Sequence, residues 1–204
     1  MKLNELEQQL GVRFPEKFHA IYKTGAMKWL EMSNDEIKEQ RADYINDSSA
    51  FLMLNCYCEP FLFEEIPDAI EELHEWIGWQ ERDRKIMLNP NITLIPFGHS
   101  GGGDQYCFLY TPQTVEPIII QYYHDEYGDP IIEGHDFDAF LYHQMLEAVE
   151  NEEDVDGENF RAQLQYLDEK YRILIEGKDA DALRDDFYDL KTETVKIWGT
   201  DDAV

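Results

Sequence analysis

The chain has 204 residues, of which 43% are hydrophobic and 13% aromatic, enough to fill the core of one large domain or of a domain with an appendage. Its 44 acidic residues outnumber 17 basic ones and give a formal net charge of -27. This charge repels phosphate backbones, which argues against direct nucleic-acid binding, and it favours a basic partner. An acidic surface also serves solubility alone.

Three helices are expected in the first part of the chain. Apolar residues recur at helical spacing before Gly11, and a second set follows Pro15, a common first residue of a helix; the two sets are Leu3, Leu6 and Leu10, then Phe18, Ile21 and Tyr22. The polar stretch that follows predicts a third helix around Asp35 to Asp43.

Two short apolar runs, Phe51 to Leu54 and Phe61 to Phe63, are predicted as strands. Pro67 then begins a helix whose apolar stripe continues until Gly78; the stripe consists of Ala69, Ile70, Leu73, Trp76 and Ile77. This helix is expected to pack on the sheet, with Trp76 in the core.

A glycine hairpin is the most informative feature. Two β-rich runs, Leu94 to Phe97 and Gln105 to Tyr110, flank a loop with four glycines in six positions: Gly98, Gly101, Gly102 and Gly103. Each glycine permits a positive φ or a close backbone approach, so the loop is expected to be preshaped, with Asp104 capping the turn.

The segment Pro117 to Tyr123 is almost wholly β-branched or aromatic, which predicts a strand buried on both faces. A further helix is expected after it, with an apolar stripe of Phe137, Phe140, Leu141 and Met145. The expected fold class is therefore α+β, a twisted antiparallel or mixed sheet flanked by helices.

A charged stretch, Glu150 to Glu158, marks a candidate boundary between an α+β domain at 1–149 and an acidic linker with a helical extension at 150–204. Two amphipathic helices separated by Gly177 are predicted in this extension, and it is expected to dock through Phe160, Leu164, Leu167 and Leu183. The acidity is spread through both parts.

The cysteine spacing Cys56-Tyr57-Cys58, with one further cysteine, suits neither a redox pair nor a zinc site, so reduced buried thiols are expected. The chain begins MKLNELEQQL without an apolar signal region, and no stretch approaches 18 apolar residues. Neither secretion nor membrane spanning is signalled, and a cytoplasmic location is expected.

The order of these motifs resembles the SUKH superfamily (Smi/Knr-like). The family pattern is a helix pair, a strand, a helix, an IPFG…GGD.Y hairpin, a PV strand and a terminal helix. It corresponds here to Glu5 with Leu10-Gly11, Phe14-Pro15, Phe18, Tyr22 and Gly25, then residues 95–106, Pro117-Ile118, His124-Asp125 and Asp136 to Leu141. The pattern is departed from at Thr24-Gly25, Leu109-Tyr110 and His135-Asp136-Phe137.

The resemblance implies a binding function without catalysis. Bacterial members resemble immunity proteins that neutralise toxins, often nucleases, and a fungal branch acts in cell-wall signalling through protein contacts. The expected function is thus a non-enzymatic protein-binding module, an immunity protein directed at a basic nuclease-type toxin. A regulatory or scaffold module of the same fold is the alternative, and the two are distinguished by whether a neighbouring gene encodes a toxin.

The hairpin and the segment near His124 carry residue types that suit three kinds of chemistry, each with a missing requirement. The sequence Gly98 to Gly102 satisfies the G-x-S-x-G elbow of hydrolases, which would make Ser100 a nucleophile, but a strand follows it where a helix is required. A phosphate cradle lacks its lysine. The carboxylates and histidines from His124 to Asp136 lack metal-binding spacing. No catalytic residue, cofactor or metal is predicted.

The partner is expected to bind a carboxylate-lined surface where the hairpin meets the end of the following strand. The predicted contributors are Asp104, Asp125, Glu126 and Asp129, with Trp79 as an exposed aromatic contact beyond Gly78.

Overall fold

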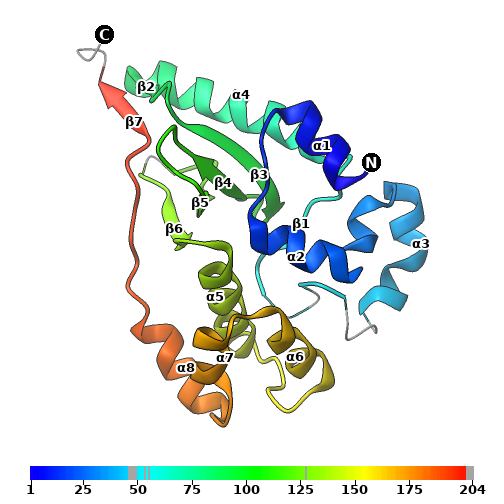
Figure 1. Cartoon of the computed structure of the whole chain (residues 1–204). Helices are drawn as coiled ribbons and strands as arrows, with labels where there is room; N and C mark the ends of the chain where they lie inside the picture. Colours follow the sequence, from blue (N-terminus) through cyan, green and yellow to red (C-terminus); the bar gives the residue numbers. More distant parts are fainter. Residues whose placement is uncertain (46–49, 53, 55, 127, 201–204) are drawn as a thin grey trace.

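A five-stranded antiparallel sheet forms the centre of the molecule in the computed structural model (Figure 1). The structure describes residues 1–45, 50–52, 54, 56–126 and 128–200. In spatial order the strands are β1 Glu59–Pro60, β3 Thr93–His99, β4 Gln105–Tyr110, β5 Ile118–Tyr122 and β6 Ile131–Gly134. The predicted α+β fold is confirmed, as are the hairpin of β3 and β4 and the buried strand β5.

Helices surround the sheet and also form the C-terminal part of the molecule. They are α1 Leu3–Leu10, α2 Glu16–Thr24, α3 Asn34–Ile45, α4 Ile66–Arg84, α5 Phe137–Glu150, α6 Glu158–Gln163, α7 Glu169–Ile175 and α8 Ala180–Asp189, with short 3₁₀ turns at Lys28–Glu31 and Leu164–Tyr166. Within the described ranges, none of these helices is both long and apolar enough to cross a membrane.

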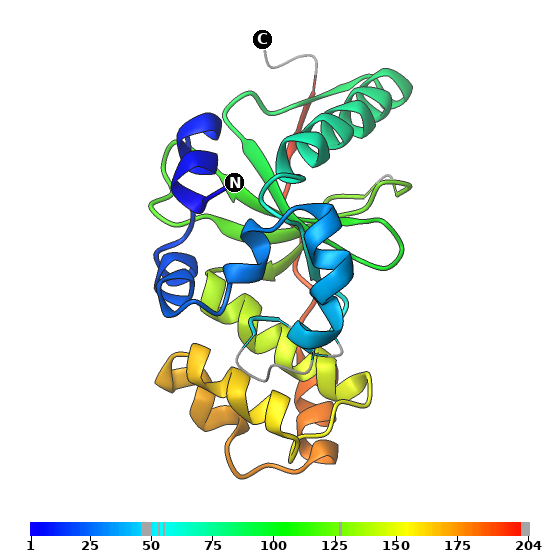
Figure 2. The ribbon, with the colours of Figure 1, turned by 90° about the vertical axis from the view of Figure 1, so that its right-hand side faces the viewer.

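The two faces of the sheet bury different sets of side chains because neighbours along a strand point to opposite sides. On β4, Tyr106 and Phe108 join a large aromatic core with α2 and α5, in which the rings of Phe97 and Phe108 stack at 4.3 Å between centroids. Cys107 and Leu109 pack on the opposite face with residues of α4. Figure 2 shows α4 above the sheet and α5 with the C-terminal helices below it.

The two strands predicted at Phe51 to Leu54 and Phe61 to Phe63 are wrong. Phe51 and Leu52 lie in a turn, Leu54 lies in a bend, and residue 53 is outside the described residues. Leu52 has a φ of 53°, which is incompatible with an extended strand, yet its side chain is buried. The run is apolar because an irregular segment enters the core here. The edge strand β1 lies between the two predicted strands, and the Phe61 N–H donates to Phe97 O at 2.9 Å.

The prediction that helix α4 ends at Gly78 is wrong, because the helix continues to Arg84. Lys85 then adopts the left-handed conformation, with a φ of 55°. A single glycine inside a helix costs only about 1 kcal/mol relative to alanine. The packing of the apolar stripe outweighs this cost, so the helix continues past Gly78. Trp79 and Gln80 therefore lie on a rigid helix beside the sheet.

The C-terminal helices pack on the α+β part, and the chain after α8 then runs along the sheet. The first of the two predicted helices is broken into α6, a 3₁₀ turn and α7; Gly177, with a φ of 82°, separates α7 from α8. Phe160, Leu167 and Leu183 are buried in the large aromatic core, and Leu164 packs against it. The proposed division at 149/150 stays a prediction.

The segment from Leu190 to Thr200 runs from α8 along the sheet to its far end, as Figure 1 shows. The N–H of Ile132 donates to Glu193 O at 2.8 Å, and the N–H of Val195 donates to Pro130 O at 3.1 Å. Strand β7, Trp198–Thr200, then pairs antiparallel with β2, Ile86–Leu88. We call residues 190–200 the return segment.

Candidate partner-binding site

The loop of the hairpin is held by Ser100. Its Oγ accepts hydrogen bonds from the N–H of Gly102 at 3.3 Å and of Asp104 at 3.1 Å, and the Gly103 N–H donates to Ser100 O at 3.0 Å. The prediction that the Asp104 carboxylate caps the turn by accepting from loop N–H groups is wrong, because the Ser100 hydroxyl accepts from these amides and the carboxylate bonds to the Ser100 hydroxyl and to His124.

Two of the four loop glycines have a conformational reason to be glycine. Gly103 has a φ of 95°, and a Cβ on Gly98 would lie 2.8 Å from Cys58 Sγ and 2.9 Å from Glu59 O, where β3 meets β1. Gly101 and Gly102 have neither a positive φ nor a close neighbour, so the expectation that every glycine is required is wrong for these two.

Asp104 ties the hairpin to the loop that follows β5. Its Oδ1 accepts from the His124 N–H at 3.3 Å and lies 2.9 Å from His124 Nδ1, while its Oδ2 accepts from the Ser100 hydroxyl at 3.3 Å. One ligand atom each from Asp104, His124 and the exposed Asp125 lie within 4.8 Å of one another. The structure thus brings two of the predicted carboxylates together, but Asp104 supports His124 and its side chain is only 16% exposed.

The remaining predicted contributors lie on the same loop and on α4. Glu126 is exposed, and its carbonyl oxygen accepts from Gln80 Nε2 at 3.0 Å, which fixes the loop to α4. Asp129 is half-buried further along the loop. Trp79, next to Gln80, is 45% exposed, which confirms the exposure predicted for it. Its contact role stays a prediction.

The loop carries a negative potential that acts on Tyr123. The pKa of Tyr123 is raised to about 12. Burial is the largest cause, and the negative charges of Glu133, Asp104 and Glu126 also raise it. The carboxylates around the loop therefore act together on a group placed beside it.

A pocket of about 490 Å³ opens between α4, β1 and the hairpin. Its lining comes from segments far apart in the sequence: Phe61, Glu72, Trp76, His99, Gly103, Gln105 and His124. The rings of Phe61 and His99 lie 5.0 Å apart between centroids, and those of Trp76 and His124 lie 5.3 Å apart. We call this the aromatic pocket. Through His124 it adjoins the segment after β5 that carries Asp125, Glu126 and Asp129, which we call the carboxylate loop.

Apart from Gly103, which is predicted as a structural residue of the loop, none of the pocket residues is a predicted site residue. Trp76, predicted to lie in the core, is half-buried; it packs against the core between α4 and the sheet and also lines the pocket. One signal was present: Glu72 and Trp76 are spaced i, i+4, so a carboxylate and an indole share one face of α4. The juxtaposition with His99 and His124 depends on the sheet pairing and had no local signal.

The hydrogen-bond order around Ser100 differs from that of a hydrolase. A nucleophilic serine needs an imidazole as its base, oriented in turn by a carboxylate. Here the carboxylate of Asp104 lies between Ser100 and His124, and the residues after the loop form β4. His135 pairs with Glu193, and Asp136 caps α5. These two residues therefore have other partners than Ser100. These contacts lend no support to the elbow interpretation.

The hairpin, the two helices before it and the strands after it stand in the order that the SUKH pattern requires. The family model of the SMI1 / KNR4 family (SUKH-1) matches residues 2–143, most of the chain. The chain belongs to this family. No curated protein and no solved structure gives a significant match to it.

The SUKH-1 match includes every residue of the aromatic pocket and of the carboxylate loop. The C-terminal helices and the return segment lie outside it. The site therefore belongs to the family fold, and the part of the chain beyond the match supports it from the other side of α5 and along the sheet.

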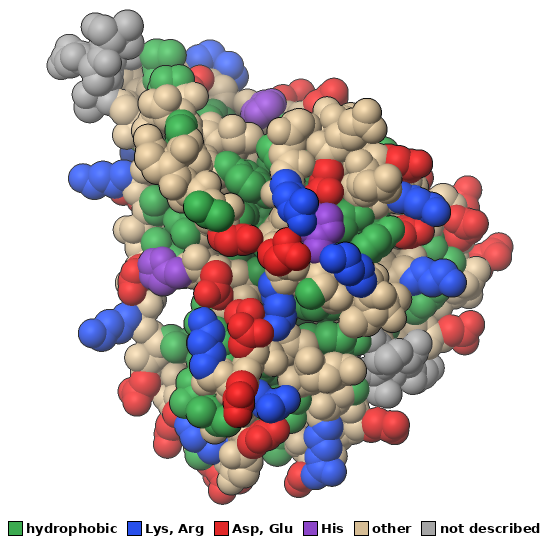
Figure 3. All heavy atoms as spheres, in the orientation of Figure 1, with side chains coloured by type: hydrophobic (Ala, Val, Ile, Leu, Met, Phe, Trp, Pro, Cys, Tyr) green, Lys and Arg blue, Asp and Glu red, His purple; other side chains and the backbone are tan. Residues whose placement is uncertain are grey.

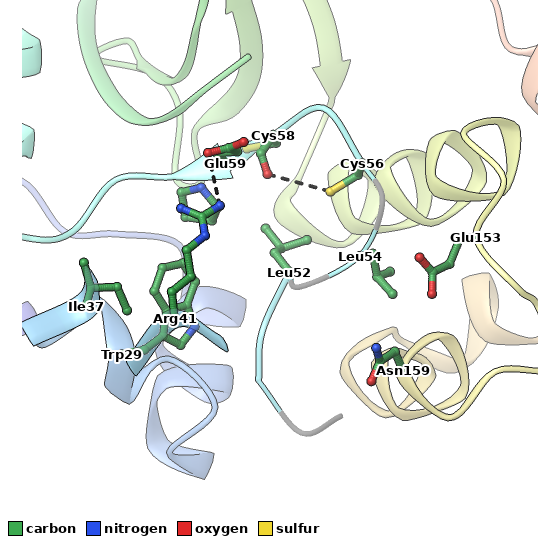
Figure 4. Close-up of a pocket in the computed structure, with 11 residues that line it drawn as sticks. Trp29, Ile37, Arg41, Leu52, Leu54, Cys56, Cys58, Glu59, Glu153 and Asn159 are labelled. Carbon is green, nitrogen blue, oxygen red and sulfur yellow. Dashed lines mark hydrogen bonds and ion pairs between the residues drawn. The ribbon is translucent and has the colours of Figure 1, made fainter. Parts of the chain in front are cut away.

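A second pocket, of about 390 Å³, lies between the SUKH-1 part and α6. Figure 4 shows Trp29, Ile37 and Arg41 on one side, Leu52 and Leu54 in the middle, and Glu153 and Asn159 on the other side. Arg41 forms an ion pair with Glu59 at 3.5 Å.

The two cysteines of this second pocket have free thiols. The thiols of Cys56, Cys58 and Cys107 are free, as predicted; Cys58 and Cys107 are also buried, whereas Cys56 is half-buried. Burial raises the pKa of Cys56 to about 12, and it raises that of Cys58 well above its usual value. Protonated thiols are poor nucleophiles and poor metal ligands, so a packing role suits these two cysteines.

Proposed function

We propose that this protein is a non-enzymatic, cytoplasmic immunity protein that neutralises a basic, nuclease-type toxin by direct binding. The partner docks on the carboxylate loop and the adjoining aromatic pocket. Membership of the SUKH-1 family supports a protein-interaction role, and the net charge of -27 favours a basic partner. The observation that carries the proposal is that Asp104, His124 and Asp125 meet within 4.8 Å and that His124 also lines the aromatic pocket.

Charge and shape have separate roles in this proposal. Acidic side chains are scattered over both the sheet part and the C-terminal helices on the face drawn in Figure 3. Such a distribution accelerates encounter with a basic partner without fixing where it lands. The aromatic pocket is where a partner gains contact area and slow dissociation, since aromatic side chains dominate the energetics of binding sites.

The test uses the toxin domain encoded by the adjacent reading frame. The triple variant Asp125→Asn, Glu126→Gln, Asp129→Asn is compared with wild type for association rate and for protection of cells against the toxin. We expect the association rate to fall by roughly three- to tenfold at low salt, and the difference to shrink near 0.15 M, where the Debye length is about 8 Å. Asp104 is left intact because it holds His124 and Ser100.

The matched control neutralises three exposed carboxylates of the C-terminal helices, Glu169→Gln, Asp185→Asn and Asp189→Asn. It changes the net charge equally but lies outside the SUKH-1 match. An equal loss in both triple variants would place the interface elsewhere or make it nonspecific. Absence of a toxin gene, with binding to a cellular protein instead, would favour the regulatory or scaffold alternative.

A further inference from the structure

The donors and acceptors of the aromatic pocket are unequally used. His99 Nδ1 lies 3.0 Å from Ser100 O, and His124 Nδ1 lies 2.9 Å from Asp104 Oδ1. A carbonyl and a carboxylate only accept, so each Nδ1 carries the proton that is donated. In the neutral ring the other nitrogen, Nε2, is then an acceptor. In both neutral imidazoles the N–H therefore donates to a residue of the hairpin, and the Nε2 atom is left as an acceptor.

Gln105 shows the same imbalance at the most buried position of the lining. Its Nε2 donates to Ala69 O at 3.2 Å and to Glu72 Oε2 at 3.3 Å, and two acceptors on this side fix the orientation of the amide. Its Oε1 has no hydrogen-bond partner in the part of the chain that the structure describes, although the residue is only 1% exposed. An acceptor left unsatisfied at this depth costs about 1–3 kcal/mol, so a donor that reached it would be favoured.

The chemistry of the lining selects a cation. Glu72 supplies an exposed carboxylate, Gln105 an unused carbonyl oxygen, and the described lining carries no Lys or Arg. Phe61 and Trp76 offer ring faces, which attract cations through their quadrupole. An anion would meet only acceptors here, and a neutral apolar group would bury them without compensation.

The geometry points to a planar organic cation rather than a metal ion. Among the described residues, the group close enough to share one ion is Asp104, His124 and Asp125, and it includes neither Glu72 nor His99. The acceptors of the pocket are therefore spread around its wall. A guanidinium presents five donors in one plane and stacks on aromatic faces, so it reaches acceptors that lie further apart than the three donors of a compact ammonium can reach.

We propose that the aromatic pocket receives an arginine side chain of the protein partner, with the guanidinium between Phe61 and Trp76 and hydrogen-bonded to Glu72 and Gln105. This inference rests on the proposed function, because it names the partner group that the same site recognises. The carboxylate loop steers the basic partner, and the pocket takes the anchor residue. Affinity and encounter rate are thereby assigned to different residues.

The pocket can be tested without the toxin. The whole protein is titrated at low ionic strength with the capped peptide acetyl-Gly-Arg-Gly-amide and, separately, with its citrulline and lysine counterparts, while the Trp76 indole N–H resonance is followed by NMR. Citrulline keeps the shape of arginine but has no charge. We expect saturable shifts with the arginine peptide and binding weaker by roughly fivefold or more with the other two.

The variant Glu72→Gln removes the carboxylate yet keeps an acceptor for Gln105 Nε2, so the pocket should stay folded. It should weaken the arginine peptide by roughly fivefold or more, the share of one charge-assisted contact. Glu71→Gln is the matched control, since Glu71 is the exposed neighbour on α4 and does not line the pocket. Glu71→Gln should leave the affinity for the arginine peptide unchanged. Equal thermal midpoints of the two variants would show that both are equally well folded.

Three results would overturn the assignment: equal binding of the arginine and citrulline peptides, tighter binding of the lysine peptide, or wild-type affinity in Glu72→Gln. The two proposals fail separately. Arginine-peptide binding without capture of the toxin removes the proposed function and keeps the pocket. Toxin capture that survives Glu72→Gln, with no peptide binding, removes the pocket and keeps the function.

Discussion

Gly98 lies where β3 bends and passes close to β1. The register of β3 and β4 shifts between Pro96 and Gly98, and a Cβ at Gly98 would meet backbone atoms of Glu59 and Pro60 as well as Cys58 Sγ. Gly98→Ala should therefore lower the free energy of unfolding by about 1–3 kcal/mol, the usual cost of overpacking. Gly101→Ala, in open space, should change it by no more than about 0.5 kcal/mol. Urea unfolding of both variants checks this, and equal losses would contradict the close approach.

The charge state of His143 is linked to the fold. Its Nδ1 lies 2.8 Å from Glu133 Oε2 on β6, Glu147 lies on the same helix, and the ring of Phe187 on α8 stacks on it at 5.7 Å. Burial lowers the pKa of His143, but the hydrogen bond and charge of Glu133 with the charge of Glu147 outweigh it, so the pKa is raised above 6.5. Burial also raises the pKa of Glu147 above 4.5.

Both shifts make the folded protein bind protons more tightly than the unfolded chain. The stabilisation from His143 is complete below pH 6.5 and is lost as the pH rises through the raised pKa. Glu147 acts in the same direction from 4.5 upward. The free energy of unfolding of wild type relative to His143→Gln should therefore shrink as the pH rises above about 6.5. His135→Gln, which removes an exposed histidine, is unfolded alongside as the control. Urea unfolding at fixed ionic strength measures both, and parallel curves for wild type and His143→Gln would refute the linkage.

At the scale of elements, the return segment joins two parts of the fold, since it bonds to β6 and pairs with β2. Ile197 is fully buried with Leu73, Ile77 and Ile120, and its carbonyl oxygen accepts from the Asn89 N–H at 2.8 Å. Ile197→Ala should cost about 2–5 kcal/mol, because it leaves a cavity between α4 and the sheet. Lys196→Ala, one residue earlier and exposed, should cost less than about 0.5 kcal/mol. A thermal midpoint for Ile197→Ala equal to that of Lys196→Ala would mean that the segment is not needed for stability.

Elements with strong local signals were predictable. The hairpin carries glycines between alternating β-rich runs, and α4 carries Pro67 before a regular apolar stripe, so residue type and period agree there. Phe51 and Leu52 are equally apolar, but their burial follows from tertiary contacts and not from extended backbone. Strands β2 and β7 have three residues each and pair across more than a hundred intervening positions, which leaves no local pattern to detect.

At the scale of the whole molecule, the residues beyond Glu150 share the core of the α+β part. Phe51 contacts Tyr166 edge to face at 6.1 Å, Gln163 Nε2 donates to Ala50 O at 2.7 Å, and Lys17 Nζ lies 2.7 Å from Asp168 Oδ1. A chain that ends at Glu150 would expose this surface. It should have a lower thermal midpoint than the whole chain and should self-associate in analytical ultracentrifugation. Equal stability and a monodisperse monomer would instead make the C-terminal part an independent appendage.

The candidate site was predictable only in its charged half. Asp104 stands just before β4, and Asp125 and Glu126 follow β5, its partner strand, so the antiparallel pairing of these strands places them near one another. The aromatic pocket needs α4 laid across the hairpin and β1 at the edge, so that Phe61, Trp76 and His124 converge from three segments. Such convergence is set by topology and packing, and a single sequence carries it only implicitly.

The return segment also has a consequence for synthesis on the ribosome. The edge of β6 meets its partner, residues 193–195, only after about 60 further residues have been translated, which takes roughly 3–12 s at ordinary elongation rates. During that interval the nascent chain carries an open sheet edge, a surface that invites pairing with other chains. Ribosome-bound chains stalled at successive lengths should gain protease resistance abruptly once the return segment has left the exit tunnel, and a gradual gain beginning at β6 would show that the edge is protected in another way.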